Sequence, residues 1–398
     1  MQLKKDVKYI SAFLLPLGCI GLSSGFILLS VILFICFNFR QINKDLISNF
    51  IKNNYIKNSF LAMIAWIVGI GLASIYNLNV DGYRQTWAYL ERMILFFIVV
   101  IYFCNAINDK KMFFWIWLGI CVASLILSFD IVYKFILMNE WRPSSTLLGN
   151  PNKLGGYLIL VLPFIIAGSF KYYENKVCYF GIIVSIVTFL SLIISGSRGA
   201  LGGFIGAVFI TFSIYFLKNH KKRRINIKLF FIILLVLSII IGGAYCFKPE
   251  FFFHGSDSER LLLWESTIKI IIDYPIAGVG FGNFNSIYVD DYISSLAREP
   301  RLTSPHNIFL HYLVNLGVVG GIPFIILVFT QIYILIKNIP LNLFSSIWVL
   351  AGLVSVIGMV IHGMVDTLIT TRPYAMMYWL LYGVACCNII RDEVVDEK

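Results

Sequence analysis

The sequence predicts an all-α polytopic membrane protein, and three observations carry this prediction. Of its 398 residues 59% are hydrophobic and only 13% are charged, and the mean hydropathy is +0.83. Soluble proteins carry roughly 25% charged residues, and a helix of about 20 apolar residues crosses a bilayer. Such runs follow one another along the chain, without the alternation of a membrane barrel. We therefore predict one integral membrane domain, residues 1–398, with about 12 transmembrane helices.

The apolar runs define the expected helices in order. Their approximate spans are 9–21, 24–38, 59–76, 90–107, 112–134, 155–170, 177–194, 200–217, 229–246, 308–336, 343–361 and 374–391. Gly21 to Gly25 permit either a turn between the first two helices or a kink in one long tilted helix. Residues 9–38 are thus expected to form one or two helices.

Basic residues set the expected orientation. Most of the 32 Lys and Arg fall on one side, including the run KNHKKRRINIK at 218–228. Cytoplasmic loops carry such an excess, so both termini are predicted to be cytoplasmic. No cleavable signal peptide is expected, because the first apolar run lacks a small-residue cleavage site. The outer side then receives five connections, at about 77–89, 135–154, 195–199, 247–307 and 362–373.

The connection 247–307 is by far the longest and is predicted to be a large periplasmic loop. Loops beyond roughly 15 residues are uncommon unless they are functional. Within it, GSDSERLLLWESTIKIIIDYP predicts a helix with Ser256 or Asp257 as its cap and Pro275 as its stop. The apolar residues expected on one face, for contact with the membrane, are Leu261, Trp264, Ile268 and Ile271.

The stretch SGSRGALGG at 195–203 places Arg198 at the outer end of a helix pair. One interpretation is a snorkelling anchor, which arginine provides well. The other is an anion-binding corner, because a helix N-terminus adds partial positive charge. Gly196 and Gly199 flank the arginine, and we expect them to make room for an anionic headgroup.

Two further motifs lie on the same outer side. In GNPNKLGG at 149–156, Asn150 is expected to cap a helix that starts at Pro151, which by itself indicates a turn and cap. In SPHNIFLHYLVNLGVVGG at 304–321, Ser304 is expected to cap and His306 to lie in the first helical turn. The helix dipole would favour a neutral imidazole there, although a polar residue facing water is the plainer interpretation.

Other polar features give weaker signals. Arg260 in the loop helix has Glu259 and Glu265 as simple surface partners. GVGFGNF at 278–284 has no preceding strand and no GK[ST], so it predicts a flexible turn and not a phosphate loop. His306 and His311 are separated by roughly 140° around a helix, which makes a poor metal pair. No metal or cofactor is predicted, and the eight cysteines are interpreted as core residues.

Taken in order, GNPNxxG, SGSRGA, a large outer loop with R…W…DYPIAGVGFGNF, and PHNxFLxxLxxLG resemble the O-antigen ligase and O-antigen polymerase family. The resemblance covers about residues 145–325. It implies a GT-C type glycosyltransferase of the bacterial inner membrane, which uses a glycan on undecaprenyl diphosphate at the periplasmic face without nucleotide sugar or metal.

The resemblance also implies roles for particular residues. Arg198 and Arg260 match the arginines expected to hold the donor diphosphate, and His306 matches the histidine expected to act as general base. These three are the predicted catalytic residues. The further substrate-binding residues predicted on the same side are Asn150, Asn152, Asn307, Arg142 and Arg301.

The acceptor stays open at this point. A ligase of lipopolysaccharide biosynthesis transfers the finished glycan to lipid A-core, and a polymerase joins lipid-linked repeat units. We favour the ligase by a small margin, because one outer loop dominates after Arg198. A transporter of lipid-linked sugars would show an internal repeat and charge at the bilayer midplane, and neither is evident. A scaffold would not require Arg198, Arg260 and His306 to converge.

Overall fold

The structure is a computed structural model of a helical membrane protein. It describes residues 2–20, 29, 32, 33, 36, 53–78, 80–105, 110–219, 256–298, 302–339 and 347–396. These residues form helices and no β-strand. Six of the described helices are long and apolar enough to cross a membrane: Asn54–Asn77, Lys111–Leu137, Pro151–Lys171, Val177–Ile194, Arg198–Asn219 and Ile308–Lys337. The predicted polytopic all-α class is confirmed.

The helices follow the predicted order within the described residues. The first group is α1 (Gln2–Cys19), α4 (Asn54–Asn77), α5 (Val80–Asn105), α6 (Lys110–Leu137), α7 (Pro151–Lys171), α8 (Val177–Ile194) and α9 (Arg198–Asn219). The second is α11 (Ser256–Asp273), α12 (Phe284–Ile287), the π-helix η3 (Tyr288–Tyr292), α13 (Ile308–Lys337), α14 (Ile347–Gly363), the 3₁₀ turn η4 (Leu368–Thr370) and α15 (Arg372–Asp396).

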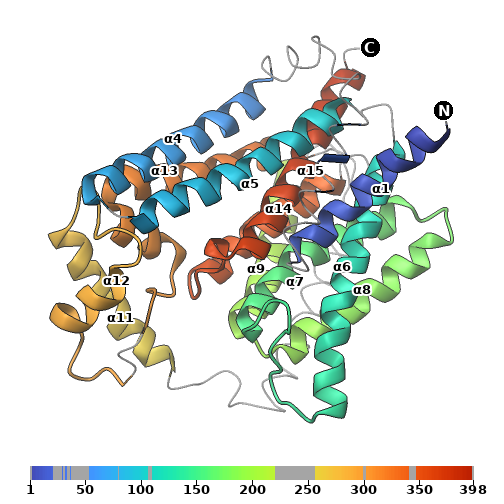
Figure 1. Ribbon diagram of the computed structural model, residues 1–398. Helices are drawn as coiled ribbons and strands as arrows, with labels where there is room; N and C mark the ends of the chain where they lie inside the picture. Colours follow the sequence, from blue (N-terminus) through green and yellow to red (C-terminus); the bar gives the residue numbers. More distant parts are fainter. Residues whose placement is uncertain are drawn as a thin grey trace.

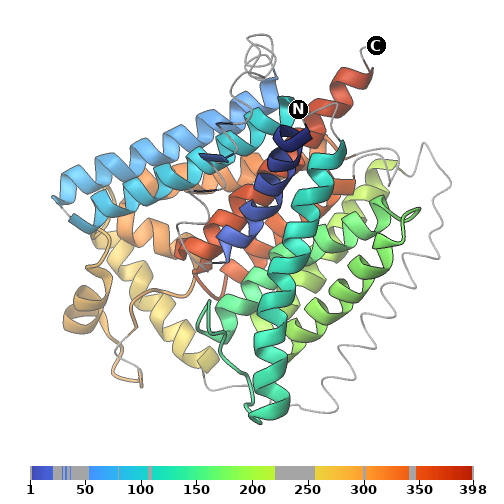
Figure 2. The same cartoon turned by 45° about the vertical axis from the view of Figure 1, so that its right-hand side comes forward.

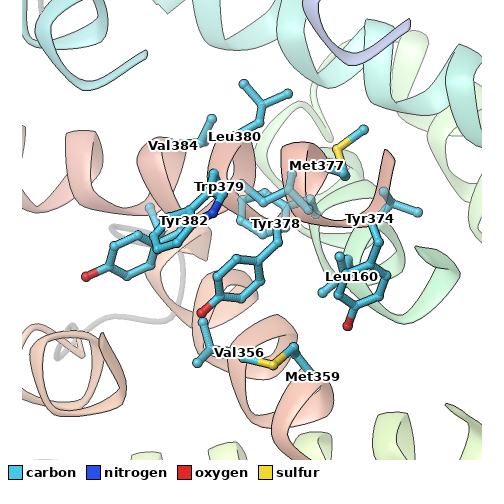
Figure 3. Close-up of a cluster of buried hydrophobic side chains, with 14 of the residues drawn as sticks. Leu160, Val356, Met359, Tyr374, Met377, Tyr378, Trp379, Leu380, Tyr382 and Val384 are labelled. Atoms are coloured by element: carbon cyan, nitrogen blue, oxygen red, sulfur yellow. The ribbon is translucent and has the colours of Figure 1, made fainter. Parts of the chain in front are cut away.

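Two helices form the centre of the bundle. α14 packs against α7, α9, α13 and α15, and α15 also packs against α5 and α7. On one side of this centre α4 lies along α13, and on the other α6 lies beside α1 and α8, as both views show (Figures 1 and 2). The buried side chains between α7, α14 and α15 are large, and Tyr374, Tyr378 and Trp379 lie among them (Figure 3). This aromatic core fixes the helices that carry the site.

The ends of several helices meet at one end of the bundle. Gly156 in α7 and Gly199 in α9 both face His362 in the last turn of α14. The starts of α7 and α9 therefore lie beside the end of α14. The helix α11 and the segment 274–298 lie beside the start of α13 (Figure 1). We call this region the site end of the bundle.

Some predicted boundaries are wrong or lie outside the described residues. α8 has the predicted bounds 177–194, but α5 begins at Val80 and not near residue 90. The expected loop 77–89 therefore shrinks to a sharp turn at Leu78, whose φ is +47°. The start of α5 contains polar residues such as Asp81 and Arg84. Because the predicted span followed apolar residues only, it did not include this part of the helix. Two predicted helices lie wholly or mostly outside the described residues: 229–246 entirely, and 24–38 for the most part.

Candidate functional site

Three arginines gather at the site end. Arg198 is the first residue of α9, and Arg260 lies in the first turns of α11. Arg142 lies in the connection between α6 and α7, and its Nη2 donates to Asn152 Oδ1 at 3.3 Å. Burial, followed by the positive charges of Arg198 and Arg260, lowers the pKa of Arg142. All three guanidinium groups therefore share one electrostatic neighbourhood, as a site for an anion requires.

The connection that carries Arg142 is held in a defined shape. Asp130 near the end of α6 accepts from the Thr146 backbone N–H at 2.6 Å and from the Thr146 hydroxyl at 2.8 Å. Lys134 Nζ donates to the Ser144 carbonyl at 2.7 Å and to Thr146 Oγ1 at 2.8 Å. Arg142 itself has a φ of +57°, a conformation that residues with a side chain rarely adopt. Such strain is maintained only where surrounding contacts fix the backbone.

The predicted cap of α7 is confirmed. Asn150 is the N-cap, its Oδ1 accepts from the Asn152 N–H at 2.6 Å, and Pro151 is the first helical residue. The cap orients Asn152, whose own Oδ1 contacts Arg142. Asn150 thus supports the arginine cluster indirectly through the turn, while Asn152 contacts it.

The glycines around Arg198 have a different role from the one expected. A Cβ atom on Gly196 would lie 2.6 Å from Cγ of Arg142, and one on Gly199 would lie 2.6 Å from Cγ2 of Val365 and 2.9 Å from Cδ2 of His362. The space that these glycines leave is filled by side chains of the protein. The expectation that they make room for a headgroup is therefore wrong. They allow Arg142 and His362 to approach α9.

His306 lies before its helix and not in the first turn. Asn307 is the N-cap of α13, because its Oδ1 accepts from the N–H groups of Phe309 at 3.0 Å and Leu310 at 3.1 Å. His306 has a φ of +49°. The predicted Ser304 cap is thus wrong: Asn307 satisfies the helix N-terminus, and Ser304 instead pairs with the Thr367 hydroxyl at 3.1 Å. Asn307 Nδ2 also donates to the Met364 carbonyl at 3.1 Å.

Asp366 is the acidic partner that the sequence left without a role. Its Oδ1 lies 3.6 Å from Nδ1 of His306, and its side chain is mostly buried. Burial alone would raise the pKa of Asp366. The neighbouring imidazoles of His306 and His362 and the backbone N–H of Thr367 outweigh it, and the pKa lies below its usual value. A polar residue soon after an apolar helix was the available signal, but sequence alone gave no partner.

The helix α11 links the arginine cluster to His306. Trp264 Nε1 donates to the Pro305 carbonyl at 2.9 Å, directly before His306. The buried face of α11 consists of Leu263 and Ile270, which pack with Val279, Phe284, Tyr288 and Val314. Leu261 and Ile268, on the face predicted to contact the membrane, are exposed on the protein surface. The helix is therefore apolar on two sides, and membrane contact of the exposed side stays a prediction.

The segment GVGFGNF at 278–284 was predicted to be a flexible turn, but its start is hydrogen-bonded to α13. α13 is broken at Gly317, whose φ is +57° and ψ −157°. The break exposes backbone groups that pair with residues 275–280. Val279 and Gly280 donate to the carbonyls of Val314 and Asn315 at 2.9 and 3.0 Å, and Val318 and Val319 donate to those of Pro275 and Ile276 at 2.8 and 3.2 Å. Four backbone hydrogen bonds therefore fix residues 275–280 on α13, the helix that begins after His306.

All but one of the predicted site residues lie at the site end. They are Arg142, Asn150, Asn152, Arg198, Arg260, His306 and Asn307. Arg301 lies outside the described residues. Within the described part of the chain, no group of three His, Cys, Asp or Glu side chains is arranged to hold a metal ion.

Comparison with known proteins gives a consistent result. Residues 183–325 match the family model described as O-antigen ligase. An uncharacterised protein of Haemophilus influenzae is 24% identical over 309 residues, which cover 72% of this chain and 75% of that protein. A ComP-specific O-oligosaccharyltransferase of Acinetobacter baylyi is 24% identical over 328 residues, which cover 77% of this chain and 56% of that protein. The chain thus spans little more than half the length of the Acinetobacter relative.

Proposed function

Starting from the O-antigen ligase domain at residues 183–325, we propose that the protein transfers a glycan from undecaprenyl diphosphate to an acceptor hydroxyl. The domain and the Acinetobacter relative support a glycan transferase of the ligase type. The matched range includes Arg198, Arg260 and His306. We place the site end at the periplasmic face of the inner membrane, with both termini in the cytoplasm, because most basic residues flank the opposite helix ends.

The arginine cluster is the observation that carries this proposal. The pKa of Arg142 is lowered by burial and then by the positive charges of Arg198 and Arg260, so the three guanidinium groups repel one another and an anion bound among them would relieve that repulsion. A diphosphate offers several oxygens to such groups, which bind phosphate in a bidentate manner and keep their charge. The N-terminus of α9 adds its partial positive charge at Arg198. Donor binding is therefore assigned to Arg142, Arg198 and Arg260.

His306 and Asp366 supply the base. Nδ1 of His306 faces the Asp366 carboxylate, so its other ring nitrogen is the one available to an acceptor hydroxyl. As the acceptor oxygen attacks the anomeric carbon, His306 takes the hydroxyl proton and the bond from that carbon to the diphosphate oxygen breaks. The electron pair stays on the diphosphate, where the arginines stabilise it. A single displacement of this kind inverts the anomeric centre.

Two acceptor classes follow from separate observations. The ligase description favours lipid A-core, while the Acinetobacter relative is named as acting on ComP, which brings a protein hydroxyl into consideration as a second candidate. Polymerisation, in which the acceptor is another lipid-linked repeat unit, uses the same site chemistry. A lipid-linked sugar transporter is disfavoured, because it would not need a histidine beside a carboxylate at this position.

Deletion of the gene followed by analysis of surface glycans tests the proposal. A ligase acting on lipid A-core predicts core without polymer and accumulation of lipid-linked polymer. Single repeat units on the core would indicate a polymerase, and loss of glycan from a protein would indicate the second candidate. Unchanged surface and lipid-linked glycans would reject glycan transfer. Complementation by the wild-type gene, but not by His306→Ala, links the phenotype to the site.

A further inference from the structure

Trp264 of α11 is hydrogen-bonded to the backbone directly before His306. Its Nε1 donates to the Pro305 carbonyl at 2.9 Å, across 41 positions of sequence. Pro305 is buried and the indole side chain is half-buried. Trp264 is also the tryptophan of the outer-loop motif R…W…DYPIAGVGFGNF, to which the proposed reaction gives no role. The bond joins α11 to the peptide that leads into the proposed base.

His306 follows this bond in a backbone conformation that needs support. Its φ is +49°, a value that residues with a side chain rarely adopt and that persists only where surrounding contacts fix the backbone. On one side, the Ser304 hydroxyl pairs with the Thr367 hydroxyl at 3.1 Å. On the other, Asn307 Nδ2 donates to the Met364 carbonyl at 3.1 Å. Both of these bonds lead to the segment that follows α14.

The bond from Trp264 leads to the donor side of the site instead. Arg260, assigned to the donor diphosphate, lies four residues earlier in α11, and helical residues four apart are neighbours on one face. Leu263 of the same helix packs in a buried cluster with Val314 of α13, so α11 is held beside the helix that starts after His306. One helical turn and one hydrogen bond therefore separate Arg260 from the His306 peptide.

We propose that Trp264 is a positioning residue, whose indole N–H holds the His306 peptide at a fixed distance from Arg260 and so from the donor diphosphate. In the proposed reaction the anomeric carbon is attached to that diphosphate. The base must therefore be held in register with the donor for the acceptor oxygen to attack. The role in transfer rests on the proposed function, whereas the tie between Trp264 and His306 is a property of the fold.

Replacing the indole by benzothiophene removes the hydrogen-bond donor and keeps the shape. In the full-length protein in nanodiscs, Trp264 is replaced by 3-benzothienylalanine, which carries sulfur in place of the N–H. Proline labelled with ¹³C at the carbonyl and histidine labelled with ¹⁵N give one amide signal, because Pro305–His306 is the only Pro–His pair in the sequence. This signal is expected to shift. The His306 ring signal, identified as the one that His306→Ala removes, should shift with it.

Two further proteins make this substrate-free test specific. Trp264→Phe removes the N–H by an ordinary substitution and should shift both signals as well. The matched control is 3-benzothienylalanine at Trp87, which lies on α5 and is 73% exposed, and it should leave both signals unchanged. An unchanged His306 ring signal in both Trp264 proteins overturns the positioning role, whatever the activity of the wild type.

Transfer kinetics separate this role from the proposed function. With 3-benzothienylalanine at position 264, kcat should fall about tenfold or more while KM for the donor stays nearly unchanged, because the guanidinium groups are intact. Arg260→Ala should instead raise KM for the donor. Shifted signals with an unchanged kcat would overturn the role of Trp264 in positioning the base. Shifted signals in a protein whose wild type transfers no glycan would reject the proposed function and leave the tie between Trp264 and His306 established.

Discussion

Nδ1 of His306 lies 3.6 Å from Oδ1 of Asp366, across the gap between the start of α13 and the connection after α14. The two residues are 60 positions apart in sequence, and no local pattern links them. Asn307 holds the same two segments together by donating to the Met364 carbonyl. The segments that carry the pair are therefore joined beside it, and with Nδ1 turned toward Asp366, Nε2 of His306 is the nitrogen left for a substrate.

Asp366→Asn is expected to lower kcat by about 10²–10⁴-fold, the range that a positioned general base contributes. The amide is nearly the same size as the carboxylate but does not stabilise the imidazolium that forms when His306 accepts a proton. Donor binding depends on the arginines and should change little. Single-turnover transfer from a labelled lipid-linked glycan measures the rate, and equilibrium binding of the same donor is the control. Equal losses of rate and donor affinity would contradict this division.

The lowered pKa of Asp366 also predicts how stability depends on pH. A carboxyl whose pKa is depressed in the folded state contributes stability that is fully present above its unfolded value, near 4, and that is lost as the pH falls through the folded value. The melting temperature of the wild type relative to Asp366→Asn should therefore decline only below about pH 4. Thermal unfolding in detergent between neutral and strongly acidic pH measures this. A difference that does not vary with pH would remove Asp366 from this role.

Gly196→Ala tests how Arg142 is seated. The new methyl group would lie 2.6 Å from Cγ of Arg142, and the φ of +60° at this position is unfavourable for alanine. Arg142 must move, so donor affinity is expected to fall about 10- to 100-fold, as for the loss of a hydrogen bond to a charged group. Gly202→Ala, in the first turns of α9 beside this turn, is the control, since nothing lies within 4 Å of a Cβ there. An equal loss in both variants would refute the assignment.

Gly317→Ala tests the backbone contact between residues 275–280 and α13. Its Cβ atom would lie 2.3 Å from the carbonyl carbon and oxygen of Ile276, and φ is +57°. Neither backbone can yield without breaking the hydrogen bonds between residues 275–280 and the helix break, so unfolding free energy should fall by at least about 2 kcal/mol. Gly71→Ala in α4 has open space and should be neutral. Denaturation of both variants in the same detergent measures the difference.

The sequence predicted the helices better than the site. Helix bounds depend on local composition, whereas the contacts of the site join residues far apart in the sequence. The composition of a span such as 177–194 decides its bounds locally. Helix α5 shows where this fails, since polar residues near Val80 are helical but not apolar. The capping of α7 by Asn150 was also readable, because a cap involves neighbouring residues.

Long-range relationships were not readable in this way. The sequence places Gly199 beside Arg198, but only the fold brings His362 into the space that this glycine leaves. Likewise, Asn307 and not Ser304 caps α13, because the chain takes a positive φ at His306 that no propensity dictates. The motifs thus located the site end, while the partners of each motif residue came from other helices.

Arg92 is a buried charge whose substitution should stabilise the protein. It lies midway along α5 and is 4% exposed. Its Nη2 reaches the Thr370 carbonyl only at 3.5 Å, and its guanidinium lies over the Tyr89 ring at 4.9 Å. Nε and Nη1 have no hydrogen-bond partner among the described residues. A guanidinium does not lose its charge by deprotonation, so this burial costs free energy that the contacts with Thr370 and Tyr89 offset only in part.

Arg92→Met keeps much of the side-chain length and removes the charge, so the unfolding free energy should rise by about 1–4 kcal/mol. Reversible unfolding in detergent, or the melting temperature where unfolding is irreversible, measures the change. Arg92→Lys retains a buried charge and should not stabilise. A loss of stability in Arg92→Met would show that the guanidinium meets an anionic or carbonyl partner in the folded protein. A gain accompanied by weaker transfer would mean that the charge is retained for the reaction at the expense of stability.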